Sequence, residues 1–110
     1  MAAVDPLAAS MTEKALQTNV QQLAKLRGWL TYHTYDSRRS DPGFPDLVMA
    51  RGRRLIFAEL KSERGRVSPA QAEWLAELQI FAVYCGSGTV GVYVWRPSDW
   101  LSGEIEEELT

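Results

Sequence analysis

The chain has little of the residues that build disulfide scaffolds and thiolate metal sites. Its 110 residues include one cysteine, Cys85, and one histidine, His33. A single cysteine forms no internal disulfide and no multi-cysteine zinc site, which is typical of a reducing compartment. We expect Cys85 to be a small buried apolar residue and His33 to be packed or hydrogen-bonded without binding a metal.

Long apolar segments are also lacking. No run approaches the ~20 residues that a transmembrane helix needs, and the start of the chain, Met1 to Ser10, lacks the basic and apolar stretches of a signal peptide. We therefore expect a cytoplasmic protein with no membrane partner. The length of 110 residues allows one hydrophobic core, so catalytic groups must come from one domain or from a second copy of it.

The net charge of −2 hides an uneven distribution along the chain. Residues 38–66 carry eight basic side chains against four acidic ones and are net +4, while the rest of the chain is net −6. A basic middle fits a polyanion site on one face of the molecule. The candidates for phosphate contacts are Arg38, Arg39, Arg64 and Arg66. We expect the acidic residues 104–110 to form a solvated tail.

Hydrophobic periodicity and capping signals predict an α/β fold, a mixed sheet flanked by helices in the order α-β-β-β-α-β-α. The expected elements are a helix over 10–27 with a Ser10/Glu13 capping box, a strand over 29–35, a hairpin with arms 46–50 and 53–61, a helix from the Ser68 cap to Gly86, a strand over 90–95, and a short helix from Ser98. We expect residues 1–9 to be a flexible lead and 10–103 to be a single domain. The last strand should run parallel to the strand of Glu59.

The end of the second long helix is ambiguous. Residues 80–84 fit helical spacing, yet an apolar run of this length also fits a short buried strand. We favour the helix, with Gly86 as its end.

Asp46, Glu59 and Lys61 form the most informative constellation. A two-residue turn at Arg51-Gly52 would place Asp46 opposite Phe57. Asp46 would then share a face with Glu59 and Lys61, with the two carboxylate residues roughly 7–8 Å apart on the diagonal. A three-residue turn would put Asp46 on the opposite face, so the prediction depends on the hairpin register.

Two carboxylates and a lysine on one strand face suit phosphodiester hydrolysis. A hard divalent cation bound by Asp46 and Glu59 would polarise a phosphate and acidify a water, while Lys61 would orient that water or stabilise negative charge. The alternative is a plain salt bridge at a sheet edge. For an isolated Glu-x-Lys triplet that alternative is the commoner one.

Glu13 and Gln71 each have two readings from spacing alone. Glu13 lies at the margin of the buried face of the first helix, where it serves either a capping box or the site. Gln71 is either the capping-box partner of Ser68 or a polar group that faces the site, and the two roles are compatible.

Four blocks of the sequence together resemble the VRR-NUC branch of the PD-(D/E)XK nucleases. They are Gly43-Phe44-Pro45-Asp46-Leu47-Val48, then Phe57-Ala58-Glu59-Leu60-Lys61, then Ser68-Pro69-Ala70-Gln71 with Trp74-Leu75, and Val94-Trp95-Arg96-Pro97 before Asp99-Trp100. Any one block is weak, but their order and spacing are specific in combination.

The resemblance implies a restriction-endonuclease-like core and Mg²⁺- or Mn²⁺-dependent cleavage of DNA, with no organic cofactor. Carried over by position, Asp46, Glu59 and Glu13 are metal ligands, Lys61 is the catalytic lysine and Gln71 is the polar residue of the following helix. Stand-alone members, often phage-encoded and then acting in the host cytoplasm, are similar to Holliday-junction resolvases that work as homodimers. The resemblance thus implies branched DNA as substrate and a second copy as partner.

Two other functions remain open from the sequence. One is a catalytically silent module that binds DNA or recruits a partner with the same fold. The other is a nuclease that acts on flaps, nicked duplex or RNA, since substrate shape is read by loops and subunit spacing that the sequence does not fix.

Overall fold

The computed structural model of the chain describes residues 5–35 and 40–110 and is built on one four-stranded sheet. The strands are β1 (Leu30–His33), β2 (Leu47–Arg51), β3 (Arg54–Leu60) and β4 (Val90–Trp95), and they lie side by side in chain order. The pairs β1–β2 and β2–β3 are antiparallel, whereas β4 runs parallel to β3. The sheet is mixed, and the parallel pairing of the last two strands is confirmed.

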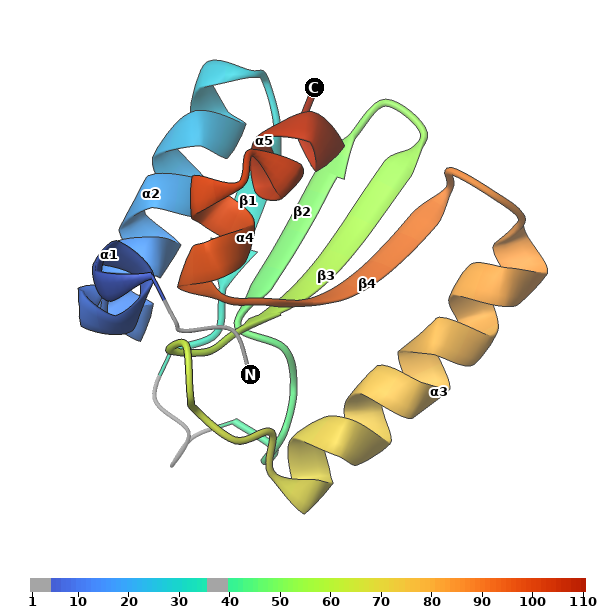
Figure 1. Cartoon of the computed structure of the whole chain (residues 1–110). Coiled ribbons are helices and arrows are strands. Elements are labelled where there is room, and N and C mark those ends of the chain that lie inside the picture. The colour runs from blue at the N-terminus through green and yellow to red at the C-terminus, as the bar shows by residue number, and fades with distance from the viewer. Residues whose placement is uncertain (1–4, 36–39) are drawn as a thin grey trace.

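Helices lie on both sides of this sheet. They are α1 (Pro6–Ser10), α2 (Glu13–Leu26), α3 (Pro69–Cys85), α4 (Pro97–Leu101) and α5 (Glu104–Glu108). Figure 1 shows α2, α4 and α5 gathered on one side of the sheet and α3 on the other. The fold class is α/β with a restriction-endonuclease-like core, as predicted. Within the described ranges, no helix is both long and apolar enough to cross a membrane.

The core lies between the sheet and the group of α2, α4 and α5. Alternate residues of β2 and β3 point into it and are at most 1% exposed: Leu47, Met49, Ile56, Ala58 and Leu60. Leu16 and Val20 meet them from α2 at helical spacing. Burial of each large aliphatic side chain contributes about 1.5–3 kcal/mol. Because strand side chains alternate, Phe57 and Glu59 point to the other face, on the side of α3.

The beginning of the chain differs from the expectation. Residues 6–10 form α1, with Ala8 fully buried, where a flexible lead was expected. The cap of α2 is Thr12, whose hydroxyl accepts a hydrogen bond from Ala15 N at 3.1 Å. The predicted capping box of Ser10 and Glu13 is therefore wrong, because Ser10 ends α1 and Thr12 starts the next helix.

The acidic C-terminal segment also differs from the expectation, because it is not a solvated tail. It contains α5, whose Ile105 and the following Leu109 are fully buried in the core. Trp29 Nε1 donates to Leu109 O at 3.0 Å. The terminal helix expected from Ser98 is two short helices, separated where Gly103 adopts a positive φ of 84°.

Three arginines from different elements hold α5 in place. Arg27 donates to Glu106 O at 2.9 Å, and Arg51 donates to Thr110 O at 2.7 Å. Arg54 donates to Glu108 O at 2.8 Å and pairs with the Glu108 carboxylate at 3.1 Å. Arg51 and Arg54 belong to the basic middle of the sequence, so part of its charge serves the fold.

The hairpin turn lies one residue later than predicted. Arg51 pairs with Arg54, so the two-residue turn is Gly52-Arg53. Gly52 has a φ of +58° and Arg53 does not have a positive φ, which fits a turn with glycine at its first central position. The predicted pairing of Asp46 with Phe57 is therefore wrong. Asp46 still shares a face with Glu59. Moving the turn by one residue changes the pairing partner of each residue by two positions, and side chains two positions apart point to the same face.

α3 is continuous from Pro69 to Cys85, which confirms the helix over the alternative of a strand at 80–84. Ser68 caps it as predicted. Cys85 lies exposed at its end, so the expectation of a buried cysteine is wrong. The helix has only Ala82 buried, and apolar residues of its last turns face outward.

Candidate active site

Asp46 and Glu59 face each other where the β2–β3 ladder ends. The last pair of the ladder is Leu47 with Ala58, so the next position outward brings the two carboxylate residues opposite each other. This is closer than the diagonal arrangement expected from the sequence. Asp46 is fixed on both sides, since its backbone carbonyl accepts from Thr34 N at 2.9 Å and its Oδ2 accepts from Leu60 N at 2.8 Å.

Glu59 is the one charged residue among those identified as buried, and its side chain is 2% exposed. Its Oε2 accepts a hydrogen bond from Gln71 Nε2 at 2.9 Å and lies 3.6 Å from Lys61 Nζ. Its Oε1 is buried and has no hydrogen-bond partner in the described structure. A buried carboxylate oxygen without a donor is costly, so this atom calls for a proton or a cation.

The pKa of Glu59 reflects this environment. Burial, together with the negative charge of Asp46, raises the pKa of the Glu59 carboxyl from 4.5 to about 8, against the opposing effect of the Lys61 ammonium. A perturbed carboxyl beside a second carboxyl and a lysine is a mark of functional sites. A bound cation and a proton would compete for this carboxylate.

Gln71 uses both ends of its amide. Its Oε1 accepts from Ser68 N at 2.8 Å, which closes the capping box at the start of α3. Its Nε2 is thereby turned toward Glu59, to which it donates. The helix cap and the contact with the site coexist in one side chain, as the sequence allowed.

Lys61 follows β3 directly and is held at the same end of the sheet. Its backbone N donates to Trp95 O at 3.0 Å, at the end of β4. Its side chain is 11% exposed, so the ammonium lies largely within the site. Asp46, Glu59, Lys61 and Gln71 are thus brought together from the hairpin and α3.

Asp46 and Glu59 fit a divalent cation of the Mg²⁺ type. Such a cation is typically held by one or two carboxylates and keeps several waters, and the unpartnered Glu59 Oε1 is an available ligand. Among the residues that the structure describes, no three His, Cys, Asp or Glu side chains gather into a metal-binding group. Glu13 is exposed at the first turn of α2 and forms no such group with the other two. Its role as a third ligand stays a prediction.

The predicted phosphate contacts divide into two sets. Arg38 and Arg39 lie outside the described residues. Arg64 and Arg66 are exposed in the loop between Lys61 and α3, which is compatible with contacts to a polyanion.

His33 is half-buried against the ring of Tyr35, with 4.0 Å between centroids.

Arg96 is a residue that the sequence analysis did not single out. Its Nη1 donates to Ser62 O at 2.8 Å and to Gly65 O at 2.7 Å, so one guanidinium fixes the loop that follows Lys61. A sequence signal was present, since Arg96 belongs to the Trp95-Arg96-Pro97 block. Its role could not be predicted from the spacing of side chains, because its hydrogen-bond partners are backbone carbonyls.

Comparison with known proteins gives one match. Residues 5–88 match the model of a family described as the VRR-NUC domain, which covers more than half of the chain. Neither the curated proteins nor the solved structures include a match.

Proposed function

Because the chain belongs to the VRR-NUC family of nuclease-type domains, we propose that it is a divalent-metal-dependent endonuclease that hydrolyses phosphodiester bonds of branched DNA. The observation that carries this proposal is the buried Glu59 carboxylate, with Oε1 unpartnered and Asp46 opposite it. Most buried polar side-chain atoms have a hydrogen-bond partner, so a carboxylate oxygen without one supports a site that takes a further ligand.

Each residue of the site has a distinct task in this reaction. Asp46 and Glu59 would hold Mg²⁺ or Mn²⁺. A bound divalent cation supplies polarisation of the phosphate and acidification of a water. Lys61 stabilises the negative charge that develops on the phosphate oxygens. Gln71 holds Glu59 through Oε2, so Oε1 would remain available as a ligand of the cation.

The pairing around Glu59 favours catalysis over a silent module. A module that only binds DNA has no need for a buried carboxylate whose pKa is raised to about 8. Leaving such a group in place destabilises the metal-free fold, which is the usual sign of a site kept for its chemistry.

We further propose that the enzyme acts as a homodimer and that the last turns of α3 contribute to the contact. Ile80, Phe81, Val83 and Tyr84 are between 50% and 85% exposed there. An apolar group of this kind on the surface marks an interaction site. Two copies would supply two sites for opposed strands of a four-way junction, which a single 110-residue domain does not offer.

One panel of labelled substrates tests the activity. Four-way junction, flap, nicked duplex, plain duplex, single-stranded DNA and RNA are incubated with Mg²⁺, Mn²⁺ or a chelator. We expect metal-dependent nicking with the junction cut fastest, and no nicking by Glu59→Gln or Lys61→Ala. Arg53→Ala is the matched control, since Arg53 is an exposed basic residue of the hairpin turn at the far end of the same strands.

Several outcomes would count against the proposal in different ways. Nicking in chelator, or full activity of Glu59→Gln and Lys61→Ala, would refute the metal-dependent mechanism. Equal cutting of all DNA forms would remove the preference for branches, and preferred cutting of RNA would replace the substrate. Light scattering tests the homodimer. A wild-type protein that is monomeric and still nicks the junction would refute the homodimer, and a Phe81→Glu variant that stays dimeric would refute the contact assigned to α3.

A further inference from the structure

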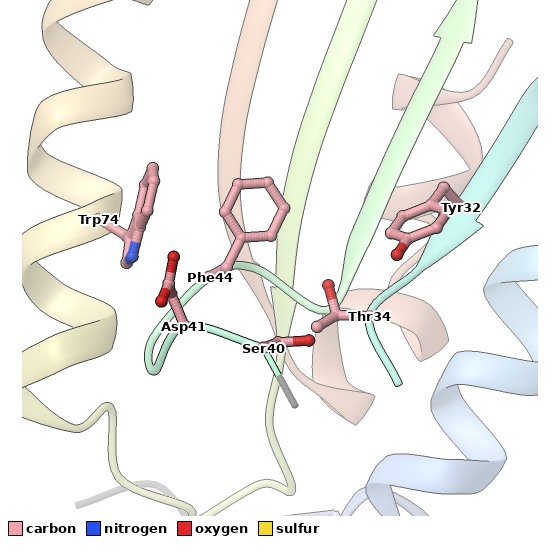
Figure 2. Close-up of a pocket in the computed structure, with 6 residues that line it drawn as sticks. All are labelled: Tyr32, Thr34, Ser40, Asp41, Phe44 and Trp74. Carbon is pink, nitrogen blue, oxygen red and sulfur yellow. The ribbon is translucent and has the colours of Figure 1, made fainter. Parts of the chain in front are cut away.

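A pocket of about 220 Å³ is connected to the candidate active site through its lining residue Thr34, whose backbone N donates to Asp46 O. The described residues that line it are Tyr32, Thr34, Ser40, Asp41, Phe44 and Trp74. Figure 2 shows Phe44 between Trp74 of α3 and Tyr32 of β1, with Asp41 beside Trp74. The pocket is smaller than the ~300–1,000 Å³ that drug-sized ligands occupy, so it suits one planar group of a larger molecule.

Phe44 and Trp74, which form the aromatic wall of the pocket, lie close in the sequence to residues of the candidate active site. Phe44 precedes Asp46 by two residues, and Trp74 follows Gln71 by three, about one turn along the same face of α3. The rings of Phe44 and Trp74 meet edge to face with 5.0 Å between centroids. The pocket therefore shares α3 with Gln71 and the segment before β2 with Asp46.

Gly43 lets the loop approach α3 closely enough to form this wall. It has a φ of +92°, and a Cβ at this position would collide with the backbone carbonyl of Ala70. A larger residue would push Phe44 away from Trp74. The close approach is a built feature of the fold and not a chance gap.

The chemistry of the described lining favours a base over a phosphate. Its described residues include no basic side chain, and the carboxylate of Asp41 would repel an anion. Tyr32 and Trp74 offer ring faces on which a base can stack, since Tyr32 is 61% exposed and Trp74 half-buried. The lining also includes the hydroxyl of Ser40 and the carboxylate of Asp41, which can form hydrogen bonds with the edge of a base.

We propose that this pocket takes one unpaired nucleobase of the DNA substrate, next to the phosphodiester that is cut. The inference rests on the proposed function, and it names the feature by which the site distinguishes a branch from a continuous duplex. Bases at a branch point are more easily unstacked, so their entry into the pocket needs less energy than extrusion from intact duplex. Asp41 accepts a hydrogen bond from an exocyclic amino group, which favours cytosine or adenine over thymine.

The test combines base removal from the DNA with ring removal from the protein. A four-way junction is prepared as a set in which one nucleotide at a time around the cut position is replaced by an abasic site. Single-turnover nicking in Mg²⁺ and binding in chelator, by fluorescence anisotropy, are measured for full-length wild type, Trp74→Ala and Trp74→Phe. Melting temperatures confirm that the variants are folded.

For wild type, one abasic position should lower nicking or affinity about 5- to 100-fold, the range for loss of one stacked base. Trp74→Ala should lower nicking or affinity on intact DNA by a similar factor, and the abasic site at that position should cause no further loss in this variant. Trp74→Phe should restore most of the effect, because it retains a ring. A cytosine there should be preferred over thymine at least about fivefold, and Asp41→Ala should abolish that preference.

The failures are separable. A flat abasic scan with active wild type overturns the pocket and leaves the nuclease intact. The proposal is also overturned if the abasic site lowers nicking and affinity by the same factor in Trp74→Ala as in wild type. The two effects would then be additive, which shows that the base and the ring do not contact each other. If no substrate is nicked, the proposed function fails, and the binding measurements alone then decide the pocket by the same criteria.

Discussion

Gln71 Nε2 donates a hydrogen bond to Glu59 Oε2 at 2.9 Å, and this contact decides which oxygen of the buried carboxylate is left free. Oε2 is also the atom nearest Lys61 Nζ. With Oε2 occupied from two sides, Oε1 has a fixed direction. The start of α3 is thus a positioning element for the site as well as a helix terminus.

The two roles of Gln71 can be separated by a pair of variants. Ser68→Ala removes the hydroxyl that accepts from Gln71 N, so it should lower the free energy of unfolding by ~1 kcal/mol and leave nicking nearly unchanged. Gln71→Ala keeps the Ser68 cap but removes the side-chain acceptor of Ser68 N and the donor to Glu59, so nicking should fall about 10- to 100-fold. Denaturant unfolding and single-turnover rates measure the two effects. Equal nicking by both variants would contradict the positioning role.

Asp46 also combines a structural and a chemical role. Asp46→Asn keeps an oxygen that accepts from Leu60 N, so its melting temperature should stay close to that of wild type. Asp46→Ala leaves this N–H without a partner and should lower stability by ~1–3 kcal/mol. Both should lose affinity for Mg²⁺ in titration calorimetry, and both should lose nicking. Wild-type metal affinity in Asp46→Asn would show that Asp46 is not a ligand.

The raised pKa of Glu59 makes the metal-free fold sensitive to pH. The native carboxyl has a pKa of about 8 and the unfolded one a value of 4.5, so between these values the native state binds more protons. The free energy of unfolding must therefore fall as pH rises through this window and level off above it. Glu59→Gln lacks this dependence.

Thermal melting in chelator from about pH 5 to about pH 9 measures this effect. The melting temperature of Glu59→Gln should rise relative to wild type across the window. Added Mg²⁺ should raise the wild-type value most at the alkaline end, because cation and proton compete for the same carboxylate. Parallel curves for the two proteins would contradict the assigned pKa.

Arg96 should act on the reaction through the loop after Lys61. Arg96→Ala removes the donor to Ser62 O and Gly65 O, so the loop should loosen and nicking should fall about tenfold. Trypsin reports the loosening, because the exposed Arg64 and Arg66 lie in this loop. Cleavage there should be faster in Arg96→Ala than in wild type. Ser98→Ala is the control, since only the backbone N of Ser98 contacts Glu63.

Local signals predicted the elements that surround the site. The Ser68-Pro69 start placed α3, and the glycines on either side of residue 87 separated it from β4 at Val90–Trp95. The common face of Asp46 and Glu59 followed from strand parity alone. These features depend on residues close in sequence, for which caps and alternation are sufficient.

The hairpin register needed information that the spacing did not contain. Arg51-Gly52-Arg53 offers two positions for a two-residue turn, and both preserve the parity of Asp46. The Gly52-Arg53 turn needs a positive φ only at Gly52, whereas a type I′ turn at Arg51-Gly52 would also need one at Arg51, and no residue other than glycine has a positive φ in the described structure. The buried Ile105 was missed for another reason: it stands among glutamates, and only the arginines from distant strands reveal that their helix is docked.

The arginine contacts that hold α5 in place have a consequence for folding during synthesis. Glu59 lies in β3 and Asp46 directly precedes β2, yet Arg51 and Arg54 of these strands donate to backbone carbonyls that lie 59 and 54 residues later in the chain. Trp29 depends on the same segment for its hydrogen-bond acceptor, Leu109 O, and the core also includes Ile105 and Leu109. A chain that is still being synthesised lacks these contacts until residues 105–110 are available, so we expect the sheet that positions Asp46 and Glu59 to be completed late in folding.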